Sequence, residues 1–169
     1  MAFQPIIDCH TKSIFGYEAL VRGLNNEPAY SVIAKVNVDN RYVFDQECRI
    51  KAISLAAKLG INSMRSINFL PNAIYQPERC IRTTLEAAKQ FDFPTENIMF
   101  EFTEVEKIED SSHVERIIKY YQSLGFQTAI DEYMWLRDIG GVTLMQGYLF
   151  AKPGFESLPS VNFLSLQPT

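Results

Sequence analysis

The amino-acid sequence predicts an α/β protein built around a largely parallel sheet. Short runs rich in β-branched and aromatic residues alternate with segments whose apolar residues recur at helical spacing. Alternating strands and helices of this kind form parallel sheets, which often close into a barrel. With 169 residues, 47% of them hydrophobic, the chain is long enough for one domain with a substantial core.

Five elements are expected in the N-terminal half of the chain. The predicted strands are 3–8, 13–23 and 65–70, and the predicted helices are 40–60 and 77–91. Asp39 is the expected N-cap of the first helix, and Gly60 marks its end. Pro77 suits the first turn of the second helix, because the missing N–H has no helical partner at that position.

The C-terminal half continues the same alternation. The predicted strands are 97–104, 126–131 and 142–150, and the predicted helices are 112–125 and 132–140. Ser112 and Glu115 have the spacing of a capping box at the start of a helix. We expect one domain over residues 1–156, followed by a tail over 157–169 without periodicity.

Composition excludes several functional classes. The net charge of -4 argues against DNA binding, and no apolar stretch is long enough to span a membrane. Asp8 lies where a signal peptide would be apolar, so we expect a cytoplasmic protein. The cysteines, Cys9, Cys48 and Cys80, have no C-x-x-C spacing, and only two histidines occur. A disulfide framework or a histidine-rich metal centre is therefore not expected.

Polar residues gather toward the ends of the predicted strands. They are Glu18, Arg22, Asn68, Glu101, Glu104, Asp131 and Gln146. The carboxyl ends of parallel strands in a barrel lie at the same end, so we expect these side chains to converge. Carboxylate and amide oxygens suit Mg²⁺ or Mn²⁺, and an arginine suits a phosphate. Together they predict metal-assisted hydrolysis of a phosphoester.

Each of these residues also has an ordinary structural interpretation. Glu18 could face solvent on an edge strand, and Asn68 could cap a strand end. Glu104 lies near Lys107 and suits a solvated turn, while Asp131 could be only the N-cap of the next helix. The functional interpretation therefore depends on the shared pattern and not on any single residue.

Four motifs resemble those of the EAL domain family, whose members hydrolyse the bacterial messenger cyclic di-GMP. The opening FQPIID…IFGYEALVRG (3–23) is similar to the family's start and contains Glu18-Ala19-Leu20. INFLPNAI (67–74), FEFTE (100–104) and QGYLFAKP (146–153) resemble later motifs of the family. They occur in the family's order and cover most of the chain.

The resemblance implies a TIM-like (β/α) barrel that holds a pair of Mg²⁺ or Mn²⁺ ions. A metal-bound water would hydrolyse cyclic di-GMP to linear pGpG. The implied metal ligands are Glu18, Asn68, Glu101 and Asp131, and the implied catalytic residues are Glu18 and Glu104. The implied substrate-binding residues are Gln4, Leu20, Arg22, Gln146 and Pro153. The resemblance also suggests a homodimer and a sensory domain in the parent protein.

The chain departs from the family at one place. A TIM barrel typically takes about 250 residues, which is roughly 80 more than this chain has. After TAID (128–131) the family continues with a second aspartate, a glycine-rich loop, a lysine and a late glutamate. Here TAID is followed directly by EYMWLRDIGGVTLMQGYLF, so two strand–helix units are expected to be missing near 131/132. Without those catalytic groups, turnover should fall by orders of magnitude.

Three explanations are open. The natural protein could contain a further segment at 131/132 and be an ordinary phosphodiesterase, as the intact flanking motifs favour. The chain could instead be truly shortened and act as a cyclic di-GMP sensor or a protein-interaction module, dimerising through open edges. It could also be an unstable remnant, because an incomplete barrel exposes two unpaired strand edges.

Overall fold

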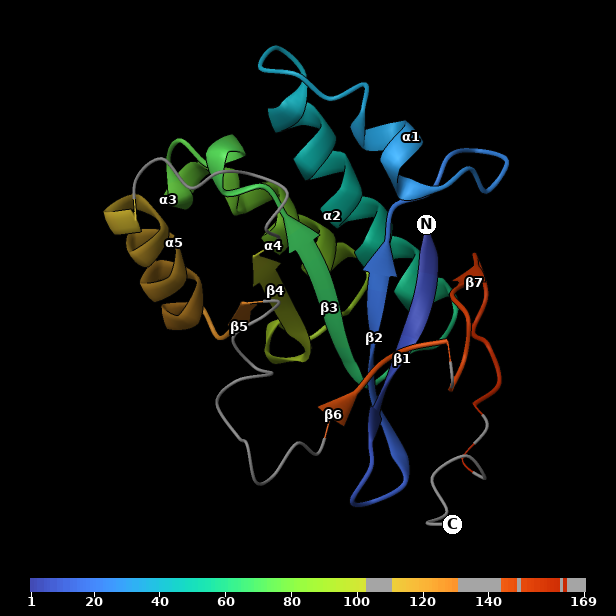
Figure 1. Ribbon diagram of the computed structural model, residues 1–169. Coiled ribbons are helices and arrows are strands. Elements are labelled where there is room, and N and C mark those ends of the chain that lie inside the picture. Colours follow the sequence, from blue (N-terminus) through green and yellow to red (C-terminus); the bar gives the residue numbers. More distant parts are fainter. Residues whose placement is uncertain (103–110, 131–143, 149, 162, 164–169) are drawn as a thin grey trace.

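The computed structural model describes residues 1–102, 111–130, 144–148, 150–161 and 163 (Figure 1). The strands are β1 (Ala2–Asp8), β2 (Ser13–Leu20), β3 (Met64–Phe69), β4 (Ile98–Phe102), β5 (Gln127–Ile130), β6 (Leu144–Met145) and β7 (Gly154–Phe155). The helices are α1 (Ala29–Ile33), α2 (Arg41–Lys58), α3 (Pro77–Cys80), α4 (Arg82–Gln90) and α5 (Ser111–Ser123). Short 3-10 turns occur at Pro71–Ala73 and Thr95–Asn97.

These strands form one mixed sheet with the order β5-β4-β3-β2-β1-β6. Strands β2, β3, β4 and β5 are parallel neighbours, whereas β1 runs antiparallel to β2. Strands β6 and β7 both pair with β1 in antiparallel fashion. The sheet curls into a half barrel with helices on its outer face (Figure 1). The prediction of an incomplete TIM-like α/β barrel is confirmed.

The main hydrophobic core lies between the outer face of the sheet and the helices. Alternate strand residues point outward, because successive side chains of a strand face opposite sides. Buried examples are Tyr17 and Ala19 on β2, Ile67 and Phe69 on β3, and Phe100 on β4. The helices contribute buried Ala52, Ile53, Ala56, Ala87, Ala88, Ile117 and Tyr121.

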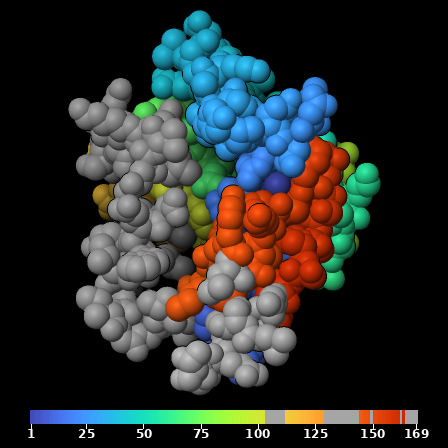
Figure 2. Space-filling model, turned by 45° about the vertical axis from the view of Figure 1, so that its right-hand side comes forward, coloured from blue at the N-terminus to red at the C-terminus, as the bar shows by residue number. Residues whose placement is uncertain are grey.

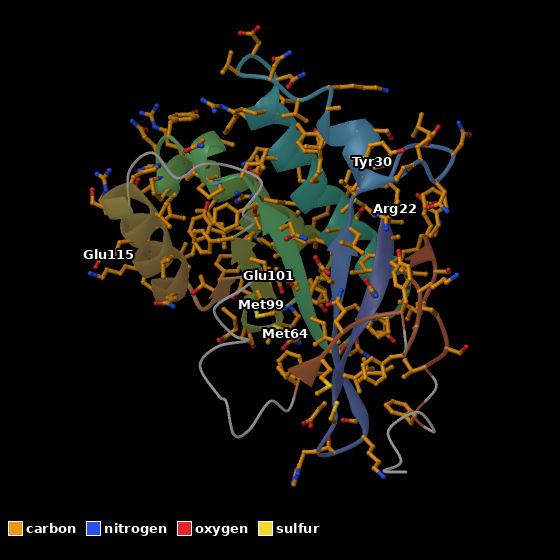
Figure 3. All side chains as sticks on the ribbon, in the orientation of Figure 1. Arg22, Tyr30, Met64, Met99, Glu101 and Glu115 are labelled. Carbon is orange, nitrogen blue, oxygen red and sulfur yellow. The ribbon has the colours of Figure 1, made fainter. Side chains whose placement is uncertain are left out.

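The inner face of the half barrel has an apolar lower part and a polar upper part. Buried Ile6 and Met99 form a small cluster with Phe15, Met64 and Leu144. Figure 3 shows Met64, Met99 and Glu101 following one another up this part of the sheet. Glu101 therefore lies above an apolar patch on the inner face.

Gly16 allows β2 and β3 to approach closely. A Cβ atom at this position would lie 2.4 Å from the carbonyl oxygen of Met64 and 2.8 Å from its Cβ. Gly16 is also the register partner of Met64 in the parallel pair. Any side chain here would push apart the strands that carry Glu18 and Asn68.

Some predicted elements differ from the structure in their bounds. Strand β2 ends at Leu20, before the predicted end at residue 23. The predicted helix 77–91 is divided into α3 and α4 at Ile81. The short helix α1 was not predicted, because its five residues are too few to show a helical period.

The predicted strand 142–150 was wrong in its described part. Only Leu144–Met145 is a strand, and Gly147 then accepts backbone hydrogen bonds from Phe150 and Ala151 in a turn. The apolar run suggested a continuous strand, but the chain turns back so that Gly154–Phe155 can pair with the start of β1. The predicted helix 132–140 lies outside the described residues.

The N-cap prediction for α2 was also wrong. Asn40 is the cap residue, and neither it nor Asp39 makes a side-chain cap bond to the helix. Instead the Oδ1 atom of Asn40 accepts a hydrogen bond from the backbone N–H of Asn37. This bond stabilises a local turn before the helix. Among the described residues, no helix is both long and apolar enough to cross a membrane.

We expect Gly16→Ala to destabilise the protein by about 1–3 kcal/mol, because the new methyl group meets backbone atoms of Met64 that cannot move aside. Urea unfolding followed by circular dichroism measures this change. The exposed Ser13→Ala in the same strand is the control and should shift the unfolding free energy by less than about 0.5 kcal/mol. Equal stabilities for the two variants would contradict the close approach.

Candidate functional site

Strand register places four predicted site residues in one row on the inner face. Gln4 on β1 is the direct partner of Glu18 on β2, and Asn68 on β3 is the direct partner of Glu101 on β4. Glu18 pairs with Ser66, so Asn68 lies one inward-facing position further along β3. Because paired residues share a face, these side chains converge at the upper part of the half barrel.

Glu18 is the centre of a hydrogen-bonded cluster. Asn68 Nδ2 donates to Glu18 Oε1 at 2.6 Å, and Gln146 Nε2 donates to Glu18 Oε2 at 2.5 Å. Gln146 Nε2 also lies 3.0 Å from Gln4 Oε1, and Gln4 Nε2 donates to the carbonyl of Ala151 at 3.3 Å. Both oxygens of Glu18 accept hydrogen bonds, as an ionised carboxylate does.

The C-terminal segment reaches this cluster through the pairing of β6 with β1. Met145 is the register partner of Ile7, and the following residue is Gln146. Figure 2 shows this segment, in orange and red, lying against the blue N-terminal part of the chain. The contact joins residues 142 positions apart in the sequence, which no local pattern could reveal.

Leu20 and Arg22 lie at the end of β2. Leu20 is half-buried and paired with Ala2, while Arg22 Nη1 donates to the carbonyl of Val21 at 2.7 Å. Arg22 itself follows the last residue of this strand by two positions, and it is labelled in Figure 3. Arg22 is half-buried, so its guanidinium lies at the border between the protein and solvent.

Three further predicted site residues are Pro153, Glu104 and Asp131. Pro153 is half-buried and directly precedes β7. Glu104 and Asp131 lie outside the described residues, so their predicted roles stay predictions.

The carboxylate and amide oxygens of the site are suitable ligands for a divalent cation. Glu18, Asn68 and Glu101 come from three adjacent strands and offer carboxylate and amide oxygens, which Mg²⁺ and Mn²⁺ prefer. The NH₂ group of Asn68 is turned toward Glu18, and its amide oxygen is the atom that could bind a metal. Within the described ranges, no cluster of three or more His, Cys, Asp or Glu side chains that could hold a metal is found.

Ser66 was missed by sequence reasoning. Ser66 is fully buried, and its strand partners are Glu18 on β2 and Met99 on β4. Its hydroxyl has no hydrogen-bond partner among the described residues. A serine two residues before Asn68 has the strand period of an inward-facing position, and this spacing was the available signal.

Asp45 was also missed, although it holds the chain just beyond Asn68. Its Oδ1 atom accepts the backbone N–H of Leu70 at 3.0 Å. Asp45 and Arg49 have the i, i+4 spacing of an exposed ion pair, which conceals their buried position on α2. Their alignment with Ala52 and Ala56 was the signal, because these alanines belong to the core-facing side.

Comparisons with known proteins agree with the fold and the motifs. The EAL domain family matches residues 1–134. A standalone versatile EAL protein from Vibrio cholerae O395, solved in its c-di-GMP bound form, is 53% identical with a TM-score of 0.88. The alignment covers 99% of this chain and 97% of that chain.

More distant relatives are longer than this chain. Klebsiella pneumoniae BlrP1, solved as a manganese/cy-diGMP complex, is 20% identical with a TM-score of 0.80, over 95% of this chain and 58% of that chain. At this identity the likeness concerns the fold alone. The blue light- and temperature-regulated antirepressor BluF of Escherichia coli (strain K12) is 28% identical over 133 residues, or 78% of this chain. This chain spans only 33% of BluF.

The family match extends over most of the sequence and includes the motif Glu18-Ala19-Leu20 and the strands that carry Asn68 and Glu101. The half barrel superimposes on a solved member of nearly equal chain length. The chain therefore belongs to the EAL domain family.

Proposed function

We propose that this chain is a cyclic di-GMP receptor that binds the nucleotide at the upper inner face of its half barrel. The observation that carries this proposal is the cluster in which Gln4, Asn68 and Gln146 surround Glu18. Supporting it, a 53% identical EAL protein of nearly the same chain length has been solved in a c-di-GMP bound form.

The side chains at this end of the sheet match the chemistry of the ligand. Cyclic di-GMP presents two anionic phosphodiesters and two guanine bases with both donor and acceptor edges. Arg22, at the border with solvent, suits a phosphate oxygen, because a guanidinium forms strong charge-assisted hydrogen bonds. Gln4 and Gln146 carry amide groups, which can both donate to and accept from a base.

A divalent cation would be held by Glu18, Asn68 and Glu101. When bound, Mg²⁺ or Mn²⁺ would offset phosphodiester charge and act as a Lewis acid on a phosphate oxygen. The manganese in the BlrP1 complex supports this choice by analogy with a distant member of the fold. Asp131 stays a further candidate ligand.

Hydrolysis of cyclic di-GMP to pGpG is the second candidate function. The oxygen donors on three adjacent strands favour it, since metal-assisted hydrolysis uses such a set. The sequence after TAID argues against rapid turnover, because the family's second aspartate, lysine and late glutamate have no counterpart there.

Partners and location stay predictions. A homodimer, a sensory domain in the parent protein and a cytoplasmic location are expected from the sequence. One relative, BluF, is an antirepressor, and this supports a protein-interaction role as an alternative for this chain.

We expect cyclic di-GMP to be recovered intact after incubation with the protein and Mn²⁺, under conditions where calorimetry detects binding. Chromatography of the nucleotide pool for pGpG makes this measurement. Rapid conversion to pGpG that is abolished by Glu18→Gln would show that the chain is a phosphodiesterase. Absence of both binding and product would refute both candidate functions.

Arg22→Ala should weaken cyclic di-GMP binding by about 10- to 100-fold, because a charge-assisted hydrogen bond to phosphate contributes roughly 1.5–3 kcal/mol. Isothermal titration calorimetry measures the change in Kd. Lys119→Ala on α5, whose side chain is exposed, is the matched control for loss of one positive charge. Equal effects of both substitutions would mean that only net charge matters and that Arg22 does not contact the phosphate.

Chelation of divalent metal should weaken nucleotide binding to the native protein, and Asn68→Ala should remove most of that metal dependence. Loss of a metal-ligating group should reduce metal affinity by at least about tenfold. Asn97→Ala is the matched control. The Nδ2 atom of Asn97 also donates a hydrogen bond to another segment, at 3.2 Å to the carbonyl of Asn62, and Asn97 directly precedes β4. If chelator affects Asn68→Ala and native protein equally, Asn68 is not a metal ligand.

A further inference from the structure

An ion pair is buried behind the strands that carry the site. Arg49 Nη2 lies 2.7 Å from Asp45 Oδ2, and the side chains are 0% and 1% exposed. Burial of two charges costs several kcal/mol each before their attraction is counted, and apolar replacements of buried pairs are often neutral or stabilising. Fold stability alone is therefore a weak explanation for this pair.

Asp45 holds the chain at the point where β3 ends. Its Oδ1 atom accepts the backbone N–H of Leu70 at 3.0 Å. Leu70 is the first residue after β3 and lies two residues beyond Asn68. The bond fixes the peptide that follows Phe69, and so it limits how the end of this strand can rotate.

Arg49 packs against the outward-facing neighbours of two site residues. Its guanidinium carbon lies 5.3 Å from the ring centroid of Phe69 and 5.0 Å from that of Phe100. Phe69 directly follows Asn68, and Phe100 directly precedes Glu101. Because neighbouring residues of a strand face opposite sides, fixing the two phenylalanines also fixes the inward direction of Asn68 and Glu101.

A second helix, α5, completes this support. Arg49 Nη1 donates to the hydroxyl of Tyr121 on α5 at 3.2 Å, and the guanidinium also lies over the Tyr121 ring, at 5.8 Å from its centroid. Burial lowers the pKa of Arg49, but the Asp45 carboxylate and Tyr121 more than offset this effect, so the guanidinium stays charged.

We propose that Asp45 and Arg49 are positioning residues, which hold the ends of β3 and β4 from behind so that Asn68 and Glu101 face the ligand. The proposal rests on the proposed function for the identity of the ligand, cyclic di-GMP. The orientation of Asn68 can be measured without ligand, so this part of the proposal is independent of the proposed function.

The chain offers a matched control in Arg65. This arginine is also 0% exposed, and its guanidinium lies 4.2 Å from the ring centroid of Phe93. Burial lowers its pKa to about 10. Arg65 lies near the start of β3, whereas Arg49 contacts its end. Comparison of the two sites separates the loss of a buried guanidinium from the loss of support at the ligand-binding end.

The experiment compares Arg49→Lys with Arg65→Lys in the full chain. Each substitution keeps a positive charge and removes the planar fork of the guanidinium. The first measurement is the NMR signal of the Asn68 side-chain amide, assigned by its loss in Asn68→Ala. The second is the Kd for cyclic di-GMP from calorimetry, and the third is the thermal midpoint of each variant.

Both variants should unfold at lower temperature than the native protein. Only Arg49→Lys should shift the Asn68 amide signal, and it should weaken cyclic di-GMP binding roughly tenfold more than Arg65→Lys. A folded Arg49→Lys protein with an unchanged Asn68 signal, and with the affinity of the Arg65→Lys protein, would overturn the proposal. If the native protein does not bind cyclic di-GMP, the proposed function fails and the Asn68 signal still decides this inference.

Milder substitutions keep the test decisive if Arg49→Lys does not fold. Asp45→Asn keeps an oxygen for the Leu70 N–H but removes the charge that faces Arg49. Tyr121→Phe removes one hydrogen bond and retains the ring. A shift of the Asn68 signal in Asp45→Asn, larger than in Arg65→Lys, is the expected result. No shift in either milder variant would refute the positioning role.

Discussion

The parallel register of β2, β3 and β4 is the constraint on which the rest of the site depends. A slip of one residue in either pairing would turn Glu18, Asn68 or Glu101 to the opposite face. The register is held on the outer side by the aromatic core and at Gly16 by direct backbone approach to Met64. The site is thus a consequence of strand packing, with its polar groups supplied by alternate residues.

The two faces of the half barrel differ in polarity and in what covers them. The outer face buries aliphatic and aromatic residues against α2, α4 and α5, while the inner face has an apolar floor and a polar upper part. The C-terminal segment adds Gln146 to that upper part. Described residues from both ends of the chain therefore complete one surface, on a framework shorter than a typical eight-strand barrel.

Much of this arrangement follows from local sequence patterns, and some of it does not. Strand-end position predicted that Glu18, Asn68 and Glu101 lie on three separate strands, and strand register shows that these strands are adjacent. The buried role of Asp45 and Arg49 was hidden, because their i, i+4 spacing is that of an exposed pair. The turn after Met145 and the pairing of β7 depend on contacts with β1, more than a hundred residues away, which an apolar run cannot specify.

We propose that oxygen atoms from adjacent strands form one site for a cation and a cyclic dinucleotide. The decisive experiment is a crystal structure of the full chain with Mn²⁺ and cyclic di-GMP, in which anomalous scattering locates the manganese. We expect a manganese peak bound by oxygens of Glu18, Asn68 and Glu101, with a phosphodiester beside it. Nucleotide bound on another face, or manganese held without these three side chains, would contradict it.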